Sequence, residues 1–273
     1  MIECLLINND CYKKYSKCIM TPSGGVLHST APTETGELSR FVQPVSGQTG
    51  AINGKLATEA ELFQAIGKNR YNNHWNKPGV EKAVHVMIGL DAGGEISACQ
   101  TLHYNMPCWG CGSGANGSYN GCYNGVSCDP LYIQIEMIED KNGDLKHCEK
   151  LYKKAVEVFA MLAKAYPKIG KNILSHAEAH KMGFASDHGD PENYWKRVGA
   201  FYTMDGFRAD VIAAMSATLF DDVRPEAWFA SDVYKVVGAG LMRGKSEKIF
   251  APYDTLTRAE LAAVLSRLLD RGI

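Results

Sequence analysis

The chain has 273 residues, 45% of them hydrophobic, which is enough for one sizeable core and a small appendage. Its net charge is −1, and it has no cluster of lysine and arginine of the kind that follows a phosphate backbone, so we expect no nucleic-acid partner. No apolar run approaches the roughly 20 residues of a membrane-spanning helix, so we expect no membrane partner either.

The N-terminal segment lacks the pattern of a secretion signal. Glu3 stands where a basic residue is expected, and the apolar run that follows is too short. We therefore expect synthesis in the cytoplasm without a signal peptide, so that any action outside the cell requires another exit route.

The nine cysteines are an odd number, and in a chain made in the cytoplasm they favour free thiols over a disulfide framework. Cys108 and Cys111 form a CxxC pair, which is typical of metal or redox sites. The next two, Cys122 and Cys128, are separated by five residues rather than two. We interpret the group as ordinary thiols.

The first half of the chain predicts a short strand, a helix and a hairpin. A glycine-rich segment, Ser23–Gly25, leads into a strand that ends at His28, and apolar spacing of three and four residues predicts a helix over Thr33–Val42. Two β-rich runs, Ala83–Leu90 and Glu95–Leu102, flank a turn sequence and predict a hairpin. The long Gly- and Asn-rich segment that follows, 104–129, predicts a functional loop beside the site.

The second half alternates strands and helices. The expected elements are a central strand over Leu131–Ile138, an amphipathic helix over Lys146–Tyr166, a strand at Ile173–Leu174, a helix from Pro191 and a helix over Met204–Leu219. This alternation predicts an α/β fold, with a mixed central sheet flanked by helices.

A glycine pattern, Gly112–Gly117, matches GxGxxG. A phosphate-binding loop of this type must open a helix, whereas Gly117, Gly121, Gly125 and Pro130 would break one. We therefore do not expect nucleotide binding.

Two histidines and a carboxylate from separate segments of the sequence together match the ligands of a zinc site. His28 is the last residue of a predicted strand, and the segment from His176 to Asp190 adds another histidine and an acid. A catalytic zinc takes three protein ligands and leaves one position open, so this inventory fits. Taken singly, His28 could be a packed strand-end histidine, and Asp190 before Pro191 could cap a helix. His180 follows His176 by four residues, but an exposed or supporting place fits it better than a ligand position.

Glu136 is an acid inside an otherwise apolar strand. Burying an unpaired carboxylate is costly, and burial raises its pKa, so the residue is either a general base or half of an ion pair with lysine or arginine.

As a set, these residues resemble the type 2 family of zinc-dependent N-acetylmuramoyl-L-alanine amidases, relatives of peptidoglycan recognition proteins and common as phage endolysins. The resemblance covers about residues 20 to 216. The matching segments are Gly25–Thr30, Val84–Gly89 with its hairpin, Trp109–Gly112, Ile133–Glu136, and Ser175–His176 with His188–Pro191.

The resemblance implies that His28, His176 and Asp190 hold zinc and that Glu136 is the acid beside the attacking water. His188 stands where the family usually has a lysine that stabilises the tetrahedral intermediate, so it either takes that catalytic role or binds zinc in place of Asp190. We favour Asp190, because the residues after it keep the family's spacing. Gly110 replaces a histidine that is common in the family.

The implied function is cleavage of the amide bond between N-acetylmuramic acid and L-alanine in peptidoglycan, with zinc as cofactor, at the cell wall after release. The alternative is a protein of the same fold that recognises peptidoglycan without cleaving it. The presence of Glu136 and of a third ligand favours the enzyme.

The tail, residues 218–273, resembles one surface-layer homology repeat following a catalytic domain over 1–217. The resemblance lies in Phe220–Val223, Trp228–Phe229, Gly240–Gly244, Phe250–Pro252 and Thr257–Glu260. Such repeats bind anionic cell-wall polymers in sets of three, so a single copy implies a homo-oligomer through the tail, with Trp228 and Arg258 on the polymer. Thr257 and Glu260 also predict a capping box for the last helix. The alternative is a small stabilising appendage.

Overall fold

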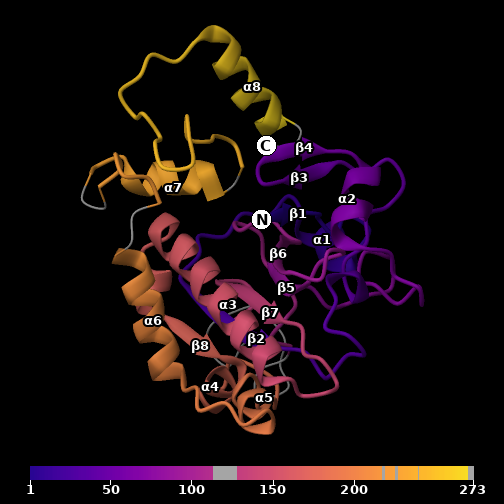
Figure 1. The fold of residues 1–273 in the computed structure, drawn as a ribbon. Helices are drawn as coiled ribbons and strands as arrows, with labels where there is room; N and C mark the ends of the chain where they lie inside the picture. Colours follow the sequence, from indigo (N-terminus) through magenta and orange to yellow (C-terminus); the bar gives the residue numbers. More distant parts are fainter. Residues whose placement is uncertain (113–127, 217–218, 225–226, 239, 270–273) are drawn as a thin grey trace.

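The computed structural model describes residues 1–112, 128–216, 219–224, 227–238 and 240–269 (Figure 1). The strands are β1 Ile2–Glu3, β2 Gly24–Ser29, β3 Gly50–Ile52, β4 Lys55–Ala57, β5 Val86–Leu90, β6 Ile96–Gln100, β7 Tyr132–Met137 and β8 Ile173–Ser175. The α-helices are α1 Asp10–Tyr15, α2 Glu59–Ile66, α3 Leu145–Ala165, α4 His176–Lys181, α5 Glu192–Arg197, α6 Met204–Ser216, α7 Ala230–Gly238 and α8 Arg258–Leu269. Two short 3₁₀ helices are Leu38–Arg40 and Ile169–Lys171.

The strands form one mixed sheet in the order β4-β3-β1-β6-β5-β7-β2-β8. Strands β5, β7, β2 and β8 are parallel to one another, whereas β5 and β6 form an antiparallel hairpin. Every residue of β2 and β7 is buried, as expected for central strands covered on both faces. The predicted mixed α/β fold is confirmed.

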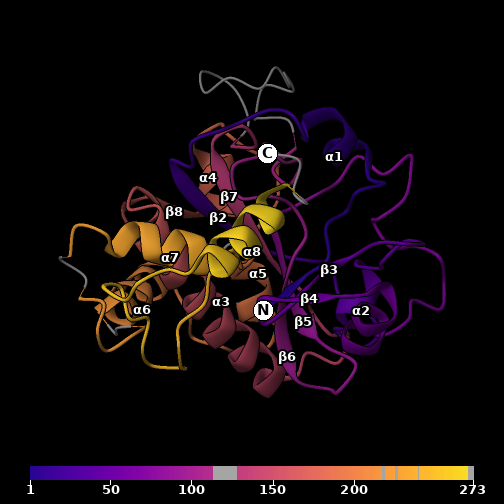
Figure 2. The same cartoon turned by 90° about the horizontal axis from the view of Figure 1, so that it is seen from above.

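Helices α3 and α6 cover one face of the sheet (Figures 1 and 2). Leu151, Ala155 and Phe159 of α3 pack with Phe207 of α6 in the main apolar core. Gly25 of β2 is required by this packing, because a Cβ atom there would overlap the Phe159 ring.

Most predicted elements are present within three residues of their expected ends. The hairpin, the central strand, the long helix, the strand before His176 and the helices near Pro191 and Met204 are all confirmed. Residues 113–127 of the predicted loop, which hold Cys122 and most of the GxGxxG pattern, lie outside the described residues.

The helix predicted over Thr33–Val42 is wrong. This segment contains one 3₁₀ turn, Leu38–Arg40, because the backbone before the turn bonds to distant residues. Thr33 donates its backbone N–H to the Glu139 carbonyl, and Gly36 has a φ of 74°, in the left-handed region. Tertiary pairing overrides the helical spacing here.

The tail is helical and has a small core of its own. Phe220, Val223, Val233 and Tyr234 pack against Ala165 at the end of α3. The Thr257–Glu260 capping box is confirmed by reciprocal hydrogen bonds. Helix α8 has no buried residue. Three of its leucines, Leu261, Leu265 and Leu269, are 46% to 73% exposed. None of the described helices is both long and apolar enough to cross a membrane.

Candidate metal centre and active site

The parallel strands bring the predicted ligands to one edge of the sheet. His28 lies near the end of β2, and β2 pairs with β8, which ends at Ser175 directly before His176. The Ser175 side chain accepts a hydrogen bond from the Glu178 backbone, so it caps α4 and fixes His176 in the first turn. Asp190 precedes α5 and accepts a hydrogen bond from the Ser29 backbone N–H at 3.0 Å.

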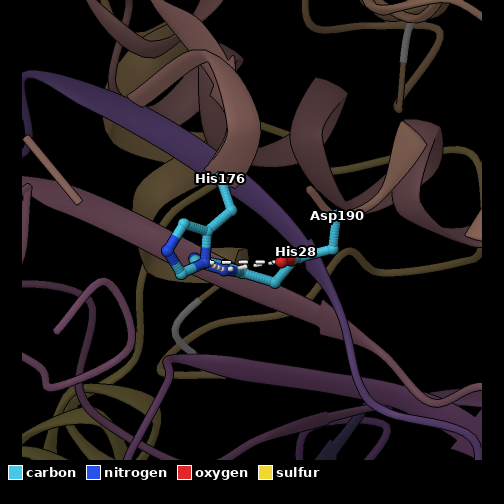
Figure 3. Close-up of side chains that lie close together, drawn as sticks. All are labelled: His28, His176 and Asp190. Carbon is cyan, nitrogen blue, oxygen red and sulfur yellow. Dashed lines mark hydrogen bonds and ion pairs between the residues drawn. The ribbon is translucent and has the colours of Figure 1, made fainter. Parts of the chain in front are cut away.

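His28, His176 and Asp190 point toward one another (Figure 3). One ligand atom from each lies within 4.8 Å of the others. The two histidine Nδ1 atoms are 3.0 Å apart, and each lies 3.6 Å from an Asp190 carboxylate oxygen. His28 and His176 are 2% and 3% exposed. Two imidazoles and a carboxylate in this arrangement can hold a metal ion.

The outer nitrogens of both histidines have other partners. Nε2 of His28 is 2.9 Å from Oε1 of Gln134, and Nε2 of His176 is 3.3 Å from the Ser186 hydroxyl. When each Nε2 carries the proton for these bonds, both Nδ1 lone pairs face each other across 3.0 Å. Two facing lone pairs repel unless a cation or a proton lies between them, so the donor set fits a metal.

The pKa values of the cluster reflect burial and close charges. Burial, followed by the field of His28, lowers the pKa of His176 to about 3. Burial alone would lower the pKa of His28, but its interaction with Asp190 and the field of Glu136 raise it instead. Burial opposes ionisation of Asp190 as well, yet both histidines hold its pKa below the ordinary value.

Glu136 lies beside the metal cluster. It is the direct partner of His28 in the β2–β7 pairing and of Met87 in the β5–β7 pairing. Its side chain is 9% exposed, and burial raises its pKa to about 7. None of the ion pairs among the described residues includes Glu136, and the fields of His28 and, more weakly, Lys82 only partly offset the effect of burial on its pKa. The arrangement therefore suits a proton acceptor better than a structural ion pair.

The cluster and Glu136 lie in a pocket of about 600 Å³. Aromatic side chains on its walls are Phe41, Trp75 and Trp109, and the cationic ones are Arg40 and Lys82. A pocket with both apolar and charged walls can hold a ligand that has apolar, polar and anionic groups.

His188 lies at the rim of the cluster. Its side chain is 61% exposed, its ring stacks on His176 with centroids 4.7 Å apart, and its Nδ1 is 3.8 Å from Asp190. It faces the same pocket. His180 is not in the three-residue cluster; its ring nitrogens lie 3.2 Å from the Ala185 carbonyl and 3.3 Å from Asp187.

The sequence reasoning missed Gln134, Asp129 and Ser186, which support the cluster. Gln134 donates to the Asp129 carboxylate at 2.7 Å, and both side chains are buried. A signal for Gln134 was present, because it lies two residues before Glu136 in an apolar strand and therefore points to the same face. Asp129 and Ser186 gave no such signal, since both lie in irregular segments.

Comparison with known proteins gives matches in both parts of the chain. Residues 219–262 match the S-layer homology domain family, which confirms the predicted repeat in the tail, although the domain boundary at 217/218 stays a prediction. No curated protein matches the chain significantly.

Several solved structures are similar to parts of this chain. One is a Staphylococcus aureus hydrolase, AmiA, in complex with its ligand (19% identity, 71% of this chain and 73% of that chain, TM-score 0.42). Another is the PlyG catalytic domain (18% identity, 80% of this chain and 98% of that chain, TM-score 0.45). A third is a mutant endolysin from Bacillus subtilis (17% identity, 71% of this chain and 87% of that chain, TM-score 0.40).

Proposed function

We propose that the chain is a zinc-dependent N-acetylmuramoyl-L-alanine amidase, which cleaves the amide bond between N-acetylmuramic acid and L-alanine in peptidoglycan. The observation that carries the proposal is the convergence of His28, His176 and Asp190 beside a buried Glu136 in one pocket. The sequence resemblance to type 2 amidases supports the same activity.

His28, His176 and Asp190 are the proposed zinc ligands, through the two Nδ1 atoms and a carboxylate oxygen. Asp190 is favoured over His188 as the third ligand, because its carboxylate lies within the cluster and is held by the Ser29 backbone. When bound, zinc supplies a Lewis acid that polarises the substrate carbonyl and makes water more acidic.

Glu136 is the proposed general base. Burial raises the pKa of its carboxyl group, which makes the carboxylate a stronger base; it can accept a proton from the attacking water and return that proton to the leaving amine. His188 lies on the accessible side of the cluster, where it can donate a hydrogen bond to the oxygen that becomes negative as water attacks. The role of His188 is thus electrostatic stabilisation.

A non-catalytic peptidoglycan-binding protein is the alternative function. Binding alone does not require a carboxyl group with a raised pKa next to a metal-ligand cluster. The presence of both features favours the enzyme.

The tail is proposed to attach the enzyme to a cell-wall polymer, so that it acts at the wall. The proposal is supported by the S-layer homology match and by Trp228, which is 86% exposed and packs edge-on against Phe229. The exposed leucines of α8 also support self-association, in which several chains together supply a multivalent wall-binding surface.

A digest of purified peptidoglycan tests the reaction. An amidase releases new amino groups from the stem peptide and creates no new reducing sugar ends. Glu136→Gln protein is the control for contaminating hydrolases. New reducing ends, or binding to peptidoglycan with no release of amino groups, would contradict the proposed activity.

A further inference from the structure

Two chains of hydrogen bonds, one buried and one partly buried, lead from the two histidines of the cluster to one turn, Trp109–Cys111. The first runs from Nε2 of His28 to Oε1 of Gln134 at 2.9 Å, and from Nε2 of Gln134 to the Asp129 carboxylate at 2.7 Å. The same Asp129 oxygen accepts the backbone N–H groups of Gly110 at 3.1 Å and Cys111 at 2.8 Å.

The donors of this first chain can be assigned. A carboxylate only accepts hydrogen bonds, so the NH₂ group of Gln134 must face Asp129, and its carbonyl oxygen must face His28. His28 therefore donates from Nε2 and keeps the lone pair on Nδ1. The backbone N–H of Gln134 is also held, by Nδ1 of the buried His85 at 3.0 Å.

The second chain reaches the turn from His176. Its Nε2 lies 3.3 Å from the Ser186 hydroxyl, which donates to the Cys111 carbonyl at 3.1 Å. Because that hydroxyl proton is used on the carbonyl, the hydroxyl oxygen is free to accept from Nε2 of His176. Ser186 is tied to the same carbonyl through its backbone N–H at 2.9 Å.

Gly110 allows the Trp109–Cys111 turn to lie close to the Gln134 side chain. A Cβ atom at Gly110 would overlap Oε1 of Gln134 and would lie 2.8 Å from a methyl group of Val84. The structure therefore explains why glycine replaces the family's usual histidine at position 110. A side chain there would displace the Gln134 amide that contacts His28.

We propose that Gln134 and Ser186 are positioning residues that fix both histidines as Nε2–H tautomers, so that both Nδ1 atoms face the metal, and that the Trp109–Cys111 turn locks the two together. The inference rests on the proposed metal site. It does not depend on the reaction that the site catalyses.

Zinc affinity measured by competition with a chelating dye tests the inference without any activity assay. Gln134→Leu keeps the bulk of the side chain and removes the acceptor, so we expect zinc affinity to fall about 10- to 100-fold. Gln100→Leu is the matched control, because Gln100 is also a buried strand glutamine, 3% exposed, but its side chain bonds to the Leu102 carbonyl, away from the cluster.

A second pair of variants distinguishes a lost hydrogen bond from misfolding. Ser186→Ala should weaken zinc binding, and Ser186→Thr, which keeps the hydroxyl, should restore it. In ¹H–¹⁵N spectra of the zinc-loaded protein, the Nε2–H signal of His28 should be protected from exchange in the wild type and lost in Gln134→Leu.

The outcomes separate the positioning role from the proposed function. Zinc affinity of Gln134→Leu within twofold of Gln100→Leu, together with an unaffected Ser186→Ala, would overturn the inference, as would a wild type that binds no zinc. A wild type that binds zinc and shows the expected losses but releases no amino groups from peptidoglycan would overturn only the amidase proposal.

Discussion

His28 and Glu136 are direct partners in the parallel pairing of β2 with β7, so an imidazole of the candidate metal cluster and a buried carboxyl group share one face of the sheet. The pairing fixes their relation through backbone hydrogen bonds of two fully buried strands. The candidate general base is thus held beside the candidate ligand cluster by two buried central strands, as a preorganised site requires.

Glu136→Gln should abolish most activity and leave the metal in place. Glutamine keeps the size of the side chain but cannot accept the proton, so we expect turnover to fall about 10²- to 10⁴-fold. The measurement is the initial rate of amino-group release, with zinc content determined on the same samples. Near-normal turnover would make Glu136 a structural residue.

Glu136 should also make the metal-free protein less stable as pH rises. Its folded-state pKa of about 7 lies above the ordinary value of 4.5, so the folded state binds more protons between these pH values and loses stability as they dissociate. The loss amounts to at most about 3 kcal/mol.

Urea unfolding of metal-free wild type and Glu136→Gln at pH 4.5 and pH 8 measures this effect. The variant should gain stability relative to the wild type at the higher pH. Glu157→Gln, on the solvent-exposed side of α3, is the control and should follow the wild type. A difference between wild type and Glu136→Gln that does not change with pH would contradict the raised pKa.

Asp190→Ala and His188→Ala separate the two candidates for the third ligand. We expect Asp190→Ala to lose zinc, because its carboxylate belongs to the cluster, and His188→Ala to keep zinc with slower turnover. Metal analysis of both purified variants decides between them. Loss of zinc in His188→Ala alone would show that our assignment is wrong.

Trp228→Ala should weaken attachment to intact cell walls and spare the hydrolysis of soluble muropeptides. The side chain is exposed and lies in the tail, so its loss removes a contact surface without disturbing the pocket. Wall pull-down and soluble-substrate rates measure the two effects, and sedimentation of the wild type tests the expected oligomer. Equal wall binding by both forms and a monomeric wild type would leave the tail as a structural appendage.

The sequence was sufficient to predict the elements whose own pattern is strong. The hairpin around Asp91, the apolar strand of Glu136 and the long helix α3 each have a clear period and clear ends. The 3₁₀ turn at Leu38 was missed, because its conformation depends on bonds to Glu139 and Leu90 that local spacing does not record.

The candidate site was only partly predictable. His28, His176, Asp190 and Glu136 were recognisable as residue types that carry chemistry, and parallel pairing explains how they meet. The sequence places Gln134 on the same strand face as Glu136, but it does not show which nitrogen of a histidine Gln134 or Ser186 contacts. Such a relation exists only in three dimensions.

The most direct test of the account is peptidoglycan cleavage by one preparation of wild-type protein before chelation, after chelation and after zinc is restored. We expect about one zinc per chain at the start, loss of amino-group release in the chelated sample, and recovery on addition of zinc. His28→Ala should contain no zinc and stay inactive throughout. Full amino-group release by the chelated, metal-free protein would contradict the proposed metal centre.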